Sequence, residues 1–282
     1  SRGRAYLFRG DDLESVTPAD EARTIIIGES PGDMFGFAIA EAGLIDDDSS
    51  IDLAIASPGA GKVYVFLNEE SGTKDLSVDT SDVVTIQGNP ADGFGFSIVG
   101  AGNVVGIVEV DQEVDERDDL LIGAPDSDTN TGSVFLYAGE DIALAETSGV
   151  SPSFKTEFTG LNPEDRFGTS IAVLGDLNPE IDRDEKSEGV ILEFNPTNDD
   201  FVVGAPGTAG GTGTVYLFFG RNDFPASVGA DEADIVLDGS TPAGEFGRLL
   251  VNLGNLTDDS FTDLEFKNDF AIGGLGFVRV EF

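Results

Sequence analysis

One composite unit recurs through the chain in a fixed order and limits what the chain can fold into. In its clearest copy the unit opens with Phe94-Gly95, passes an acidic loop, and continues through two apolar segments, 120–125 and 134–137. Four Phe-Gly pairs open such copies, at Phe35, Phe94, Phe167 and Phe246. Their starts lie 59, 73 and 79 residues apart. Self-similarity on this scale favours a propeller or a solenoid.

Short apolar segments within each copy indicate β-strands. They consist of β-branched and aromatic residues, and they are separated by Gly, Pro, Asn and Asp, as in strands joined by tight turns. A fourth segment of this kind precedes each new Phe-Gly, at residues 83–86, 153–158 and 235–237. No long segment keeps the apolar period of a helix. We therefore predict an all-β fold with little helix.

The combined order Phe-Gly, acidic loop, Gly-Ala-Pro and Val-Tyr-Leu-Phe resembles the FG-GAP repeat of integrin α-subunits and their microbial relatives. The resemblance covers residues 35–282, although the fourth copy has Gly273-Gly274 without the proline. It implies a β-propeller whose blades are four-stranded antiparallel sheets arranged radially, which protects the sheet edges.

The repeat boundaries divide the chain into one propeller region with incomplete ends. We expect a partial blade at 1–34, full blades at 35–93, 94–166 and 167–245, and a partial blade at 246–282. The expected strands do not sum to a whole number of four-stranded blades. We therefore expect a part of a longer propeller, or ends that pair with another copy. Because Ser1 to Phe8 already has the pattern of a strand, a processed or excised N-terminus is expected.

The charge of the chain is extreme and evenly spread. There are 54 acidic and 15 basic residues, a net charge of −39. Such a surface repels itself unless salt screens it, which indicates adaptation to molar salt in a halophile. The alternative is an acidic secreted protein whose carboxylates are partly neutralised by Ca²⁺. Nucleic acid and anionic membranes are disfavoured as partners, and no apolar segment of this region is long enough to span a membrane.

Two residue types that commonly carry chemistry are absent. The chain has no His and no Cys. This removes the commonest general base, the usual zinc ligands, His-based triads and disulfides. We therefore expect a protein that is not an enzyme.

The acidic loops are the candidate cation sites. Oxygen ligands at alternating positions, followed by a carboxylate four residues later, can wrap a hard cation such as Ca²⁺. The candidate ligands are Asp46, Asp48 and Asp52; Asp111, Glu113, Asp115 and Asp119; Asp176, Asn178, Glu180 and Asp184; and Asn255, Asp259 and Asp263. The FG-GAP resemblance implies structural Ca²⁺ at these positions. Where the family usually has Gly in the loop, this chain has Ser49, Glu116, Ile181 and Ser260. The alternative is that these acids belong to a halophilic surface.

Three functions fit these patterns. The leading hypothesis is a non-enzymatic, extracellular, Ca²⁺-stabilised adhesion propeller on the cell surface of a halophilic microbe, binding a protein or glycan ligand. The second is a structural subunit of a surface filament or sheath, in which copies of the chain pair with one another. The third is a glycan-active enzyme that uses a carboxylate pair. Because propellers host many functions, the fold alone does not choose among the three.

Overall fold

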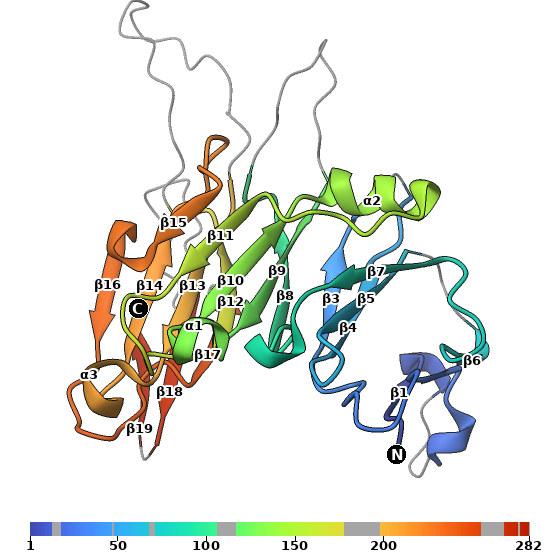
Figure 1. Cartoon of the computed structure of the whole chain (residues 1–282), viewed down its shortest axis with the longest axis horizontal. Coiled ribbons are helices and arrows are strands. Elements are labelled where there is room, and N and C mark those ends of the chain that lie inside the picture. The colour runs from blue at the N-terminus through green and yellow to red at the C-terminus, as the bar shows by residue number, and fades with distance from the viewer. Residues whose placement is uncertain are drawn as a thin grey trace, which may run out of the picture.

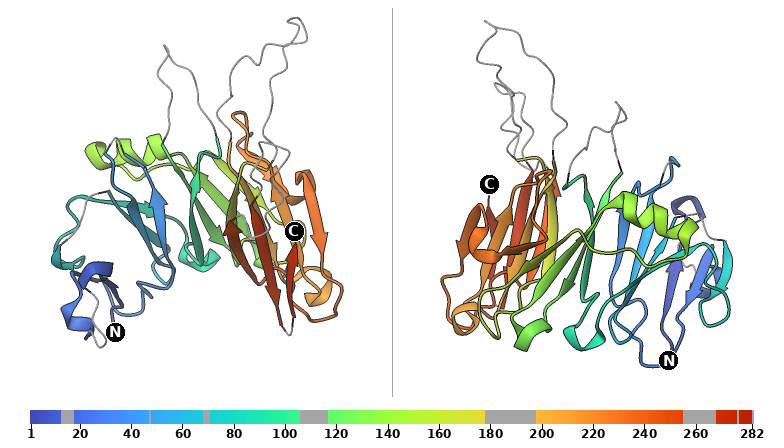
Figure 2. Two further views of the ribbon diagram at one scale, coloured as in Figure 1. Left: turned by 180° about the vertical axis from the view of Figure 1, so that it is seen from behind. Right: turned by 45° about the horizontal axis from the view of Figure 1, so that its top comes forward.

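In the computed structural model the described residues are 1–12, 18–46, 48–67, 71–105, 117–177, 198–254, 268–275 and 277–281. They form five β-sheets that follow one another in chain order, from the N-terminal sheet in blue to the C-terminal sheet in red (Figure 1). Figure 2 shows the N-terminal and C-terminal sheets at opposite ends of this row.

Three of the sheets contain all four strands of the predicted repeat. The first complete blade consists of β3 (Ile39–Gly43), β4 (Asp52–Ser57), β5 (Lys62–Phe66) and β7 (Val83–Gln87). The second consists of β8 (Ser97–Gly102), β9 (Asp119–Ala124), β10 (Ser133–Tyr137) and β11 (Thr156–Thr159). The third consists of β12 (Ser170–Gly175), β13 (Asp200–Ala205), β14 (Thr214–Phe218) and β16 (Ile235–Asp238). Neighbouring strands pair antiparallel in all three, which confirms the predicted fold class.

The two terminal sheets hold three strands each. The N-terminal sheet contains β1 (Arg4–Leu7), β2 (Thr24–Ile27) and β6 (Gly72–Asp75), and the C-terminal sheet contains β17 (Leu249–Gly254), β18 (Asp269–Gly274) and β19 (Phe277–Glu281). The first strands β3, β8, β12 and β17 are successive neighbours. The blades therefore meet along their first strands, as the blades of a propeller do.

The Phe-Gly pairs lie where one blade meets the next. Phe94 is 2% exposed and packs in one cluster with Val63 and Ile86 of the preceding blade. Its ring centroid lies 5.7 Å from that of Phe135 in its own blade. Gly95 has φ +89°, and its N–H donates to the Gly123 carbonyl at 3.0 Å. The ring thus fills the space between blades, and glycine allows the left-handed turn behind it.

The connectors between third and fourth strands contain the features that the sequence patterns did not predict. The connector of the first blade contains β6, and that of the third blade contains β15 (Ser227–Gly229). β6 pairs in parallel with β2, and β15 pairs in parallel with β11. Both strands therefore join the sheet of the preceding blade, as Figure 1 shows for β15 beside β11.

Helical segments are few in the described part of the chain. The longest, α2 (Gly139–Ser148), lies in the connector of the second blade and contacts β7. The remaining segments are short: α1 (Ser127–Asn130), α3 (Thr208–Gly211), η1 (Gly10–Asp12), η2 (Ala19–Glu21), η3 (Pro90–Asp92) and η4 (Ala230–Glu232). In that part of the chain, no helix combines the length and the apolar character needed to cross a membrane.

Candidate cation-binding loops

In each of the four sheets that contain a second strand of the repeat, that strand begins with a buried aspartate. Asp52, Asp119, Asp200 and Asp269 are the first residues of β4, β9, β13 and β18. Their exposed fractions are 3%, 3%, 0% and 6%. Aspartate is seldom this buried unless its carboxylate is paired or hydrogen-bonded. The repeated position indicates one structural role in all four sheets.

In the second blade this aspartate ties three chain segments together. Asp119 accepts hydrogen bonds from the N–H groups of Val104 and Val105 at 3.0 Å each, just after β8. Its other oxygen accepts from the Gly139 N–H at 3.1 Å, just after β10. Each carboxylate oxygen therefore satisfies backbone donors that would otherwise be buried without partners.

Asp200 repeats this arrangement in the third blade. It accepts from the N–H groups of Leu177 and Gly220, both at 2.8 Å. In the first blade Asp52 accepts from the Ile45 N–H at 2.8 Å. The aspartate at the start of the second strand thus holds the end of the first strand and, in the second and third blades, the end of the third.

Burial raises the pKa of these carboxyl groups. The pKa of Asp119 rises to about 7 because the group is withdrawn from water, although its three backbone bonds oppose the rise. Burial likewise raises the pKa of Asp200 to about 7, and the charges of Asp176 and Asp199 add to it. A cation close to these loops would favour the ionised carboxylates.

The first loop is the one whose predicted ligands are all described. Asp46 Oδ1 accepts from the Asp48 N–H at 2.8 Å, and Asp48 Oδ1 accepts from the Ser50 N–H at 2.5 Å. Behind them, burial raises the pKa of Asp52 to about 7, and the charges of Asp46 and Asp48 raise it further. The three carboxylates therefore interact electrostatically, and their oxygens are the donors that Ca²⁺ prefers.

The side chains of these loops are of the types that bind Ca²⁺, but the described ones are not arranged as a cation site. Among the described residues, no group of three or more Asp, Glu, His or Cys side chains is placed to hold a metal ion. The predicted ligands outside the described residues are Asp111, Glu113, Asp115, Asn178, Glu180, Asp184, Asn255, Asp259 and Asp263. The cation sites therefore stay predictions, with Asp46, Asp48 and Asp52 as the set that the structure places.

Counting positions along the loops did not identify two of the buried aspartates. In the third and fourth copies it selected Asp184 and Asp263, whereas Asp200 and Asp269 begin the second strands. A different signal was present in the sequence. In all four copies an Asp stands directly before Leu or Phe at the start of the apolar segment.

In three of the four sheets, the residue before the buried aspartate contacts the preceding blade. Asp118 Oδ2 accepts from the Leu44 N–H at 2.7 Å, and the Asp118 N–H donates to the Leu44 carbonyl at 2.9 Å. Asp199 makes the same pair of bonds with Asn103, at 2.9 and 2.8 Å. At the next junction the Asn268 side chain donates to the Leu174 carbonyl at 2.7 Å. We call this contact the interblade clasp.

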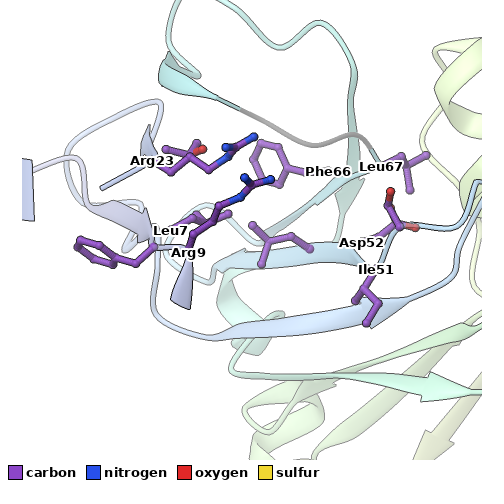
Figure 3. Close-up of a pocket in the computed structure, with 11 residues that line it drawn as sticks. Leu7, Arg9, Arg23, Ile51, Asp52, Phe66 and Leu67 are labelled. Atoms are coloured by element: carbon purple, nitrogen blue, oxygen red, sulfur yellow. The ribbon is translucent and has the colours of Figure 1, made fainter. Parts of the chain in front are cut away.

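The first junction has a cavity where the later ones have the clasp. Ile51 precedes Asp52 in the position of Asp118, and it is 66% exposed. It lines a cavity of about 360 Å³, together with Arg9, Arg23 and Phe66. Figure 3 shows these side chains around the cavity, with the Asp52 carboxylate among them. Two cationic side chains therefore line the same cavity as a buried aspartate.

Comparison with known proteins identifies the same relatives as the repeats. No protein-family model matches the chain. Integrin alpha-IIb of Mus musculus is 31% identical over 151 residues, which is 51% of this chain and 13% of that protein. Integrin alpha-5 of Xenopus laevis is 29% identical over 191 residues, or 66% of this chain and 15% of that protein. Integrin alpha-4 of Xenopus laevis is 26% identical over 182 residues, or 61% and 15%.

These matches cover more than half of this chain but only a small part of each relative. The chain spans 13–15% of the length of the curated relatives it matches. The similarity thus concerns a part of each relative and not its whole length. The chain is similar in sequence to integrin α-subunits and folds into β-propeller blades, which confirms the resemblance predicted from its Phe-Gly and Gly-Ala-Pro repeats.

Proposed function

We propose that the chain is a non-enzymatic adhesion module, an extracellular β-propeller region that binds a protein or glycan ligand. The observation that carries this proposal is the similarity to integrin α-subunits over 51–66% of the chain. The absence of His and Cys from the sequence also favours binding over catalysis.

The acidic loops bind Ca²⁺ in this proposal, and the bound ion has a structural role. In the first blade Asp46 and Asp48 would hold it, with Asp52 behind them. Asp111, Glu113, Asp115 and Asp119 would serve the second blade, and Asp176, Asn178, Glu180 and Asp184 the third. Asn255, Asp259 and Asp263 would serve the fourth. Ca²⁺ supplies positive charge that offsets the mutual repulsion of these carboxylates.

The proposed setting is the cell surface of a halophilic microbe. The net charge of −39 supports this, because repulsion spread over a whole surface is tolerated only when ions screen it. Ligand binding should therefore be measured in molar KCl.

An array experiment tests adhesion directly. The labelled chain is applied to glycan and extracellular-protein arrays in molar KCl, with Ca²⁺ or with EDTA. We expect saturable retention that EDTA removes and Ca²⁺ restores. Cleavage of arrayed glycans without retention would instead favour the glycan-active enzyme and contradict the proposal.

A surface filament or sheath is the second candidate, and one observation favours it. β17 exposes a row of apolar side chains, with Leu249 60%, Val251 43% and Leu253 36% exposed. Negative-stain images of the pure chain in molar KCl check this candidate, which requires ordered polymers.

A further inference from the structure

The connectors between third and fourth strands cover the outer strand of the preceding blade in two ways. In the first and third blades the connector adds a strand, β6 beside β2 and β15 beside β11. In the second blade it adds the helix α2, whose Ile142 packs with Val84 and Ile86 of β7. The apolar face of β7 is therefore covered by a helix, whereas β2 and β11 also gain a paired edge.

Alternate backbone groups of β7 point away from its sheet. The Gly88 N–H donates to the carbonyl of Gly61, just before β5, at 2.8 Å. Bonded positions alternate along an antiparallel pair, and the same register continues through β7, so residues 84 and 86 also face β5. The N–H and C=O groups of Val83 and Thr85 therefore face outward.

The outward groups of Val83 and Thr85 have no partner within the described part of the chain. β7 ends the sheet order β3-β4-β5-β7, and no described strand pairs with its other edge. The connector of the second blade bonds this edge where the Gln87 N–H donates to Ser151 Oγ at 3.3 Å. That connector, residues 138–155, is described throughout. The open edge is therefore a property of this blade and does not depend on where the sequence begins or ends.

The open edge is long enough to accept a strand and is already held in place. β15 contributes three residues to its parallel pair with β11, so residues 83–85 can support a pair of similar length. Behind the edge, Val84 is 4% exposed and Ile86 is 0% exposed. An ordered edge loses little conformational freedom when an extended segment adds to it, and its backbone groups supply the hydrogen bonds.

We propose that the outer edge of β7, at residues 83–85, binds an extended basic segment of a partner polypeptide by strand addition. The segment takes the place on β7 that β6 and β15 take on β2 and β11. None of the predicted cation ligands belongs to β7 or α2. The inference therefore goes beyond the proposed adhesion function and holds whether or not the acidic loops bind Ca²⁺.

The segments around this edge indicate the charge of the partner. Residues 76–87 and 139–151 contain five acidic residues and no Lys or Arg. Two apolar side chains of the second segment are also exposed, Leu144 at 57% and Val150 at 67%. A segment that alternates Lys or Arg with apolar residues complements both features, whereas a second copy of the chain, with its net charge of −39, is a poorer match. The five acidic residues are all exposed: Asp79, Asp82, Glu140, Asp141 and Glu146.

A peptide titration on the full chain tests strand addition. The probe is a fluorescein-labelled peptide of sequence Lys-Val-Lys-Val-Lys-Val-Lys, and its binding in molar KCl is followed by fluorescence anisotropy. We expect saturable binding, with slower hydrogen exchange of the Val83 and Thr85 amides but not of the Val84 amide, which faces β5. A peptide with Thr in place of each Lys should bind severalfold less tightly, because it lacks the complementary charge.

Thr85→Pro tests the backbone contact itself. Proline removes an outward N–H but leaves the bonds to β5 in place, as in the edge strands where proline is tolerated. We expect the peptide to bind at least about tenfold less tightly, with an unchanged circular dichroism spectrum of the chain. The matched control is Thr85→Val, which keeps the N–H and should leave the affinity unchanged.

A second pair of variants keeps the test independent of any effect of proline on folding. Val150→Lys places a positive charge beside the edge on an exposed residue, and it should weaken binding of the basic peptide severalfold. Leu161→Lys makes the same change of charge at another exposed residue, which is 44% exposed and lies in a different loop. It should leave the affinity unchanged.

Three results would overturn the proposal. The first is the absence of saturable binding, and the second is equal affinity of the peptide for the wild-type and Thr85→Pro chains. The third is sedimentation showing that the chain self-associates and that Thr85→Pro abolishes this, which would assign the edge to a second copy.

Discussion

Single residues at the junctions decide how one blade is held to the next. At the clasp between the first two complete blades, Asp118 bonds the backbone of Leu44, and Asp199 bonds Asn103 at the following junction. The glycine before each bonded residue has a positive φ, +83° at Gly43 and +60° at Gly102. A Cβ atom at Gly102 would overlap the Asp199 carboxylate. The glycine thus permits both the turn and the approach of the neighbouring blade.

Gly102→Ala should therefore destabilise the chain more than the same change at Gly254. Both glycines have nearly the same φ, +60° and +62°, but a Cβ at Gly254 meets no atom of the described residues within 4 Å. Placing alanine at a positive φ costs free energy in both variants. The difference between their losses in the free energy of unfolding therefore measures the contribution of the clasp. We expect Gly102→Ala to lower the free energy of unfolding by about 1–3 kcal/mol more than Gly254→Ala. Equal losses in chemical denaturation would show that the clasp contributes nothing.

The protonation of Asp199 gives the clasp a pH dependence. Burial raises the pKa of Asp199 to about 6, and the charges of Asp118 and Asp176 add to the rise, against an ordinary value of 3.8. The folded state therefore holds this proton more tightly than the unfolded state. The stabilising contribution is complete below pH 3.8 and is lost as the pH rises through about 6.

Asp199→Asn should remove this dependence and preserve the fold, because Asn268 already occupies the same place at the next junction. Between pH 4.5 and 7 in EDTA, we expect the wild type to lose about 1–2 kcal/mol relative to the variant. Denaturant midpoints at each pH measure this difference. Parallel pH profiles for the two proteins would contradict the assignment.

At the scale of elements, the connectors do more than join strands. β6, α2 and β15 each cover the outer strand of the preceding blade. α2 achieves this without adding a strand, since Ile142 and Ala145 on one face of the helix are buried against β7 and its neighbours. The blades are therefore linked at their outer edges as well as along their first strands.

Ile142→Ala tests the cover on β7. Ile142 is 0% exposed, and its truncation would leave a cavity between the helix and the blade. We expect a loss of about 2–4 kcal/mol in the free energy of unfolding. The control is Leu144→Ala in the same helix, which is 57% exposed and should cost less than about 0.5 kcal/mol. Similar losses for the two variants would mean that α2 does not stabilise the blade.

The sequence predicted the strands of the blades well because each strand has an apolar pattern that repeats. The second strand shows this most clearly, with Leu53, Leu120, Phe201 and Phe270 after the buried aspartates. The covers were not predicted, because a single buried side chain such as Leu76 or Val228 leaves no periodic signal. Parallel pairing of β6 with β2 is also non-local, so nothing near residues 72–75 indicates it.

Much of the candidate site was predictable by residue type but not by position. Asp52 and Asp119 were selected, and the structure gives both a buried place at the start of the second strand. Asp200 and Asp269 were not, because the nine-position spacing was placed directly after the first strand in those copies, from Asp176 and Asn255, whereas in the second copy it was placed late in the loop, from Asp111. Loop length varies freely on a surface, whereas the first residue of a buried strand is fixed by its hydrogen bonds.

At the scale of the whole molecule, a strongly negative chain holds a repeated row of buried carboxylates. Asp52, Asp119 and Asp200 all have pKa values raised to about 7, so keeping them ionised at neutral pH costs folding free energy unless cations lie near. Monovalent salt screens the charges that are exposed to solvent. A divalent ion held in the loops would act on the buried carboxylates as well.

The central claim, an integrin α-like propeller region stabilised by Ca²⁺, is tested most directly by thermal unfolding at constant ionic strength. The chain is melted in molar KCl at pH 7 with EDTA and with excess Ca²⁺, followed by circular dichroism. A ligand that binds only the folded state stabilises that state by about 2.7 kcal/mol when the free ligand concentration is a hundred times Kd. We expect a melting temperature several degrees higher with Ca²⁺, and a smaller rise after Asp46→Asn and Asp48→Asn. Superimposed curves in EDTA and Ca²⁺ would contradict it.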